Sequence, residues 1–294
     1  MPERLQGFVQ HQIDTGGAII SAWVKGDGNP LLMLHGYPET HLMWHKVAPT
    51  LSEQYTVVIP DLRGYGESSC PETTVDHYPY SKKAMAEDMA CVMERLGYDT
   101  FFLVGHDRGA RVSHQLAVDF PDRVRKCMLL DILSTLDLYE RTDMWFASKY
   151  YHWFLFLQPY DLPERLLKGN MDAYIKHSLG SFSSDPRLYP ADVVEAYIQS
   201  FETPGHIHAS VEDYRAGGTI DLEHQRADRA AGRKILCPLR VLWGEKGVMS
   251  HYDVLNIWGE CADQVDGWAV KDSGHFIPEE KPDEIIKALK EFCH

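Results

Sequence analysis

The strongest chemical signal in the chain is the pentapeptide Gly105-His106-Asp107-Arg108-Gly109. It follows a strand-like apolar run and opens a helical one, which is the setting of a turn that presents a nucleophile at its tip. The glycines permit a sharp, crowded bend that Cβ atoms would block. Asp107 stands at the tip, and a carboxylate there attacks carbon directly and leaves an ester on the enzyme. The alternative interpretation is an aspartate that caps the following helix.

The second signal is Asp272-Ser273-Gly274-His275, between the last predicted strand and the closing helix. Among fifteen histidines a lone one is usually structural, but the order nucleophile, acid, histidine is that of α/β-hydrolases and singles out His275. The acid has two candidates. We prefer Asp131, at the end of an apolar run, over its rival Glu245. Asp131 would accept the Nδ1–H of His275 and fix its tautomer.

A third motif, His35-Gly36-Tyr37-Pro38, follows another apolar run. In this arrangement the loop supplies one N–H of an oxyanion hole and the residue after the nucleophile supplies the other. Those donors would be the backbone amides of Tyr37 and Arg108. An ordinary turn is the alternative, because Gly and Pro mark turns anywhere.

The charge balance implies that, if this protein binds an anion, it must do so at a local cationic site. The chain carries 29 Lys and Arg against 43 Asp and Glu, a formal charge of −14, so nucleic acids and anionic membranes are poor partners. Arg108 and Arg111 are spaced i, i+3 in the first turn of the predicted helix and therefore share a face. The helix N-terminus adds positive potential there. The alternative is a solvated or ion-paired arginine pair.

The elements that position these residues alternate between strands and helices, which predicts an α/β fold with a mostly parallel sheet. Helical spacing covers 81–96, the stretch that follows Gly109 and ends at Phe120, and 282–292. Residues 133–230 hold no strand-like run and read as a helical insertion. We expect a core domain of residues 1–132 and 231–294 and a cap domain of residues 133–230. The predicted strands are 7–14, 18–24, 31–34, 55–60, 100–104, 124–130, 239–243 and 264–270.

Composition predicts an ordinary globular, cytoplasmic protein. Apolar residues make up 44% of the 294, and no apolar run approaches the roughly 18 residues of a membrane span. The first seven residues have no apolar segment, so we expect no secretory signal. Six scattered cysteines without a C-x-x-C pair argue against structural zinc and a disulfide framework.

Taken together, the motifs resemble those of α/β-hydrolases with an aspartate nucleophile, which include haloalkane dehalogenases, epoxide hydrolases and haloacetate dehalogenases. The stretch Asp61-Leu62-Arg63-Gly64-Tyr65-Gly66-Glu67-Ser68 adds to the likeness. Three details favour the fluoroacetate/haloacetate dehalogenases. Arg108 stands where haloalkane dehalogenases carry tryptophan, Arg111 follows, and the insertion contains Tyr150-Tyr151-His152-Trp153-Phe154 and Glu212-Asp213-Tyr214-Arg215-Ala216-Gly217.

The resemblance implies an eight-stranded sheet with a helical cap inserted after strand six. It implies a triad, a pair of residues that holds the substrate carboxylate, and a halide pocket. The triad would be Asp107, Asp131 and His275, and the substrate carboxylate would be held by Arg108 and Arg111. The halide pocket would be formed by His152, Trp153 and Tyr214, with Tyr150 and Tyr151 as the other candidates for the tyrosine. It implies no metal or organic cofactor, a small haloacid as the binding partner, and a possible homodimer.

Three functions remain open from the sequence. The first is hydrolysis of a 2-haloacid, such as fluoroacetate or another haloacetate, through a covalent aspartyl ester. The second is an epoxide hydrolase using the same Asp-His pair, with Tyr151 and Tyr214 protonating the epoxide oxygen. The third is a non-catalytic binding protein of the α/β-hydrolase fold.

Overall fold

The computed structural model describes residues 4–294 and contains one eight-stranded sheet. Residues 1–3, part of the N-terminal segment on which the expectation about a secretory signal rests, lie outside the described residues. The sheet order is β1-β2-β4-β3-β5-β6-β7-β8. The strands are β1 Val9–Asp14, β2 Ile19–Lys25, β3 Asn29–Leu34, β4 Tyr55–Pro60, β5 Phe101–His106, β6 Val124–Leu130, β7 Leu239–Gly244 and β8 Val265–Val270.

The direction of strand pairing differs between one edge of the sheet and the rest of it. The two pairs at one edge, β1–β2 and β2–β4, are antiparallel, and the remaining pairs are parallel. Every residue of β4 and β5 is buried, as expected of central strands covered on both faces, whereas most of edge strand β1 is exposed. The predicted mostly parallel α/β sheet is confirmed.

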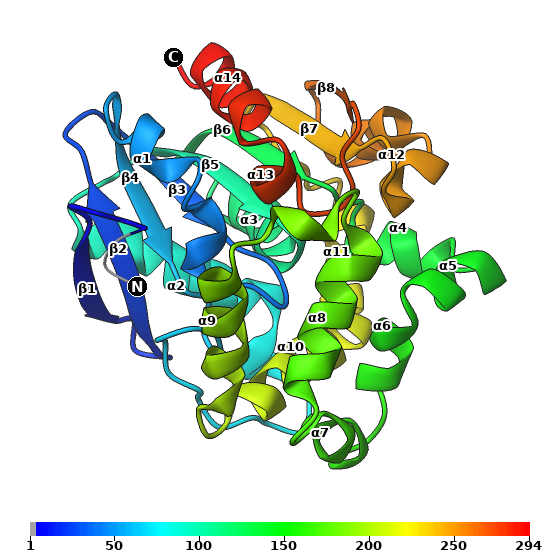
Figure 1. Cartoon of the computed structure of the whole chain (residues 1–294). Coiled ribbons are helices and arrows are strands. Elements are labelled where there is room, and N and C mark those ends of the chain that lie inside the picture. Colours follow the sequence, from blue (N-terminus) through cyan, green and yellow to red (C-terminus); the bar gives the residue numbers. More distant parts are fainter. Residues whose placement is uncertain (1–3) are drawn as a thin grey trace.

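Helices of the core cover both faces of the sheet (Figure 1). Helix α2 (Lys82–Arg95) begins where the Ser81 side chain accepts from Ala84 N, an N-cap interaction. It packs on α3 (Asp107–Asp119), which itself contacts β5 and β6. The other core helices are α1 Ala48–Leu51, α12 Val254–Cys261, α13 Ile277–Glu280 and α14 Pro282–Phe292, with 3-10 turns at His41–Trp44, Tyr78–Tyr80 and Val248–His251.

The segment between β6 and β7 is helical, as predicted, and gathers on one side of the sheet, green to yellow in Figure 1. Its division from the core as a separate domain stays a prediction. No helix among residues 4–294 is long and apolar enough to cross a bilayer. The inserted helices are α4 Thr135–Glu140, α5 Met144–Lys149, α6 Tyr151–Phe156, α7 Leu162–Leu167, α8 Met171–Phe182, α9 Ala191–Glu202, α10 His206–Gly218 and α11 Ile220–Ala230, with a 3-10 turn at Pro186–Leu188.

The sheet brings the candidate catalytic residues together at the carboxyl ends of its parallel strands. Tyr37, Asp107, Asp131 and His275 follow β3, β5, β6 and β8 respectively. Because these strands run parallel, the segments that follow them meet outside the carboxyl ends of the strands, where ligands bind in open α/β sheets.

Candidate active site

Asp107 lies at the tip of a strained turn between β5 and α3. Its φ is +46°, a conformation that residues other than glycine seldom adopt. Glycines leave the space that this turn needs: a Cβ on Gly36 would lie 2.6 Å from the Asp107 Cβ, and one on Gly109 would lie 2.3 Å from the His35 carbonyl oxygen. The Tyr37 N–H donates to Asp107 Oδ1 at 3.0 Å. The side chain is thus presented at a fixed angle, as a nucleophile requires.

Asp107 is buried yet ionised. Burial raises the pKa of its carboxyl group, but the charges of His275, His106, Arg111 and Arg108 outweigh burial and bring the pKa below its ordinary value. The carboxylate is therefore negative at neutral pH, the form that attacks carbon.

His275 lies between two aspartates. Its Nδ1 is 2.5 Å from Asp131 Oδ2, and its Nε2 is 3.7 Å from Asp107 Oδ2. Burial lowers the pKa of His275, but the hydrogen bond and charge of Asp131 more than compensate, so the pKa is raised above its ordinary value. Asp131 is itself held, because its Oδ1 accepts from Gly244 N at 2.8 Å.

Glu245, the rival acid, lies elsewhere. Its side chain is exposed and accepts from the backbone N of Asp272 at 3.1 Å. The structure therefore pairs His275 with Asp131 and not with Glu245. The catalytic role of the pair stays a prediction.

Arg108 is buried and ion-paired, which is the alternative that the sequence left open. Its Nε donates to Asp213 Oδ2 at 2.9 Å, and its Nη2 donates to Asp213 Oδ1 and to the Asp213 carbonyl, both at 2.6 Å. The guanidinium lies 4.2 Å from the centre of the Tyr214 ring. Asp213 also accepts from Tyr65 Oη at 2.8 Å and binds Lys82 Nζ.

Sequence reasoning missed this network. Asp213 stands next to Tyr214 in a quoted stretch, but no spacing rule links it to Arg108, which lies 105 positions away. The sequence could have predicted only that Arg108, if buried, would pair with some carboxylate, because buried charges are usually paired.

Arg111 keeps an unused donor. Its Nη1 donates to Leu133 O at 3.1 Å and to Thr135 Oγ1 at 3.0 Å, while its Nε has no hydrogen-bond partner within residues 4–294. The guanidinium lies 4.7 Å from the centre of the Trp153 ring, and Trp153 Nε1 is likewise buried without a partner in the described chain. An unpaired buried donor costs about 1–3 kcal/mol, so both N–H groups suit an anion as acceptor.

Asp107 lines a small cavity, which we call the inner cavity. Its volume is about 10 Å³, about the room of one water molecule. His152 and Tyr214 line it, whereas Arg108, Arg111 and Trp153 do not. The lining residues are Tyr37, Pro38, Asp107, Tyr150, His152, Tyr174, Ser178, Phe182, Tyr214, His275 and Phe276.

The structure separates the three competing tyrosines. Tyr150 and Tyr214 line the inner cavity, but Tyr151 is 41% exposed and does not. The tyrosine pair expected for an epoxide hydrolase, Tyr151 with Tyr214, is therefore not brought together. Burial raises the pKa of the Tyr214 hydroxyl, which keeps its proton for donation, and burial lowers the pKa of His152 to about 3, which keeps its imidazole neutral.

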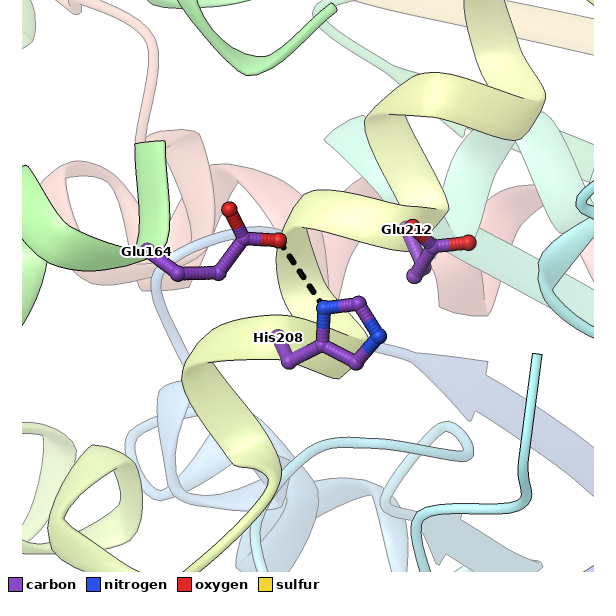
Figure 2. Close-up of side chains that lie close together, drawn as sticks. All are labelled: Glu164, His208 and Glu212. Carbon is purple, nitrogen blue, oxygen red and sulfur yellow. Dashed lines mark hydrogen bonds and ion pairs between the residues drawn. The ribbon is translucent and has the colours of Figure 1, made fainter. Parts of the chain in front are cut away.

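Glu164, His208 and Glu212 have the spacing of a metal site (Figure 2). His208 Nδ1 lies 2.9 Å from Glu164 Oε1. Arg215 Nη1 donates to Glu164 Oε1 at 2.6 Å and to Glu212 Oε1 at 2.7 Å, so a guanidinium already occupies the oxygens that a metal would need. The residues do not fit a metal ion; they form an ion-pair cluster that joins α7 to α10, away from the inner cavity.

Comparison with known proteins agrees with this geometry. The chain is 39% identical to a fluoroacetate dehalogenase of Burkholderia sp over 98% of this chain and 94% of the relative. It is 32% identical to a soluble epoxide hydrolase of Corynebacterium sp. (strain C12), over 97% and 98%. A candidate alpha/beta hydrolase from Nostoc sp PCC 7120 superposes with a TM-score of 0.95 at 49% identity, over 98% of both chains. A family profile described as the alpha/beta hydrolase fold matches residues 29–282, and this chain belongs to that family.

Proposed function

We propose that this hydrolase cleaves the carbon–halogen bond of a small 2-haloacid, converting a haloacetate to glycolate and halide through an ester on Asp107. The observation that carries the proposal is the placement of two buried guanidinium groups, Arg108 and Arg111, in the first turn after Asp107. Arg108 is paired with Asp213, but no carboxylate pairs with Arg111 within residues 4–294, and a guanidinium of this kind beside an ionised nucleophile is suited to an anionic substrate. The identity to a fluoroacetate dehalogenase supports the same substrate class.

The first step is a displacement. Arg111, through its unpartnered Nε, and Arg108 hold the substrate carboxylate and aim the α-carbon at Asp107. An Asp107 oxygen forms a bond to that carbon while the carbon–halogen bond breaks, and the halide leaves with the bonding electrons. Because neither arginine lines the inner cavity, the walls of that cavity must shift when the substrate binds.

The departing halide needs hydrogen-bond donors. Tyr214 and His152 line the inner cavity, and the Trp153 N–H is buried without a partner in the described chain. Donors placed where negative charge develops stabilise the transition state more than the ground state. Fluoride gains most, since it is a poor leaving group and a strong acceptor.

The second step is ester hydrolysis. Water attacks the carbonyl carbon of the Asp107 ester and gives a proton to His275 Nε2, while Asp131 steadies the resulting imidazolium. The N–H of Tyr37, already on Asp107 Oδ1, and the N–H of Arg108 hold the oxyanion. Collapse breaks the bond between the acyl carbon and the alkoxide oxygen while the His275 imidazolium returns its proton to that oxygen. Glycolate leaves with an oxygen from Asp107, and the carboxyl group re-formed on Asp107 loses its proton to solvent.

Halide release from fluoro-, chloro- and bromoacetate is the direct test. In a single turnover in ¹⁸O-water the new hydroxyl oxygen of glycolate should be unlabelled, because it comes from Asp107. Label in first-turnover glycolate would exclude the covalent route.

A variant separates the two steps. His275→Asn should still be alkylated but not hydrolysed, so one carboxymethyl group per chain should accumulate on Asp107 and be seen by mass spectrometry. Asp107→Asn, checked for deamidation, is the control that should form no adduct. Unmodified His275→Asn enzyme after incubation with haloacetate would count against the scheme.

An epoxide hydrolase is the second candidate. Tyr150 and Tyr214 both line the inner cavity with Asp107 and could protonate an epoxide oxygen, and an epoxide hydrolase is among the relatives. The small cavity and the adjacent arginines favour the haloacid. Turnover of styrene oxide but not of haloacetate would reverse this choice, and no turnover of haloacids, epoxides or esters would favour a non-catalytic binding protein.

A further inference from the structure

A second cavity adjoins the inner one. This outer cavity has a volume of about 510 Å³ and lies between the inserted helices α5, α6 and α8 and the segment from Lys246 to His251 that follows β7. Tyr150, Phe182 and His275 line both cavities. These three residues therefore form a wall that the outer cavity shares with the cavity lined by Asp107.

The outer cavity differs from the rest of the molecule in charge. The chain has 43 acidic residues and a formal charge of −14, yet no Asp or Glu within residues 4–294 lines this cavity. Lys149, Lys246, His177 and His251 do line it, together with His275 at its inner end.

The two lysines are differently placed. Lys149 ends α5 and has no ion pair among residues 4–294. Lys246 Nζ lies 2.7 Å from Asp272 Oδ1, but both side chains are 54% exposed, so the pair contributes little free energy and an incoming carboxylate can compete with Asp272 for the lysine.

We propose that the outer cavity is the entrance through which anionic substrate reaches Asp107, with Lys149 and Lys246 attracting the carboxylate. The identity of the substrate rests on the proposed function; the cationic entrance itself does not. A cleft lined by charge of one sign, with walls of low dielectric constant, concentrates oppositely charged ligands and raises their association rate. Such a device matters most in an acidic protein, whose overall field repels anions.

The walls of the entrance contain a natural reporter. Trp145, on α5, stacks on His251 with ring centroids 4.1 Å apart, and both rings line the outer cavity. The fluorescence of Trp145 should therefore sense small solutes that enter this space.

Kinetics test the attraction. In Lys149→Gln/Lys246→Gln, kcat/KM for chloroacetate should fall on the order of tenfold at low ionic strength with kcat nearly unchanged, and high salt should remove the difference. Neutral chloroacetamide should be unaffected. The control is Lys287→Gln/Lys290→Gln, which removes the same number of positive charges from α14, a helix that lies apart from α5 (Figure 1). A loss shared by chloroacetamide, a loss that persists at high salt, or no loss at all would overturn the proposal.

Quenching tests the entrance without any reaction. The Trp145 signal is the difference between each protein and its Trp145→Phe counterpart. Iodide should quench it less in the double lysine variant than in the wild type, while neutral acrylamide should quench both equally. Unchanged iodide quenching would refute the cationic entrance even if haloacetate is turned over. If iodide quenching falls in the double lysine variant but the wild type does not turn over haloacids, the result would support the cationic entrance and contradict the proposed substrate.

Discussion

Arg108 and Asp213 form a buried bidentate ion pair, in which Arg108 Nε donates to Oδ2 at 2.9 Å and Arg108 Nη2 donates to Oδ1 at 2.6 Å. It joins the first turn of α3, next to Asp107, to α10 of the inserted helices. The charges of Arg108 and Lys82 hold the pKa of Asp213 well below its usual range against the opposing effect of burial. The pair therefore sets the position of one of the two guanidinium groups that we assign to the substrate.

Asp213→Asn should be costly. It leaves the Arg108 charge buried without its partner, which typically lowers the free energy of unfolding by about 3–5 kcal/mol. Urea denaturation measures this. The control is Asp172→Asn, which removes the partner of Lys176 in a pair whose side chains are 61% and 60% exposed, and should cost no more than about 1 kcal/mol. If both variants lose the same free energy of unfolding, the buried pair stabilises the protein no more than an exposed pair does.

Asp131→Asn should shift the pH dependence of turnover. His275 must be neutral to accept a proton from water, so kcat should fall as the pH drops through its pKa, which Asp131 holds above the ordinary value. Loss of that carboxylate lowers the pKa, so the acid limb should move to lower pH while the plateau also falls. Glu245→Gln should leave the kcat profile unchanged; a shift there instead would make Glu245 the partner of His275.

Arg111→Leu should weaken binding of the carboxylate. Loss of one charge-assisted hydrogen bond costs about 1.5–3 kcal/mol, on the order of ten- to a hundred-fold in kcat/KM for haloacetate. Haloacetamide, which is neutral, should lose less. If both substrates suffer equally, Arg111 acts only through its bonds to Leu133 and Thr135.

Trp153→Phe removes the unpartnered N–H and keeps the aromatic ring. If that N–H assists departure of the halide, kcat should fall most for fluoroacetate and hardly at all for bromoacetate. For fluoroacetate the activation free energy should rise by about 2.7–4 kcal/mol, as on loss of a single oxyanion-hole donor. Tyr214→Phe and His152→Gln should follow the same order more weakly. A packing role predicts a similar loss for all three halides together with lower stability, because Trp153 also contacts Tyr139 and Phe146.

The sequence alone determined the architecture because its signals are local. The apolar runs at 55–60 and 124–130 match β4 and β6 residue for residue, and the others fall within a few residues of the observed strands. The glycines around Asp107 marked a turn because only a residue without Cβ fits there. Parallel strands then place Asp107 and His275 at one edge without further information.

Only the tertiary structure decided which side chains meet. Asp131 and Glu245 both follow strands, and the 2.5 Å contact with His275 distinguishes them. Tyr150 and Tyr151 are neighbours in sequence, yet one is buried at the inner cavity and the other faces outward. The pairing of Arg108 with Asp213 likewise follows from how the inserted helices pack on the core. Such contacts join residues far apart in the chain, and no local periodicity or spacing encodes them.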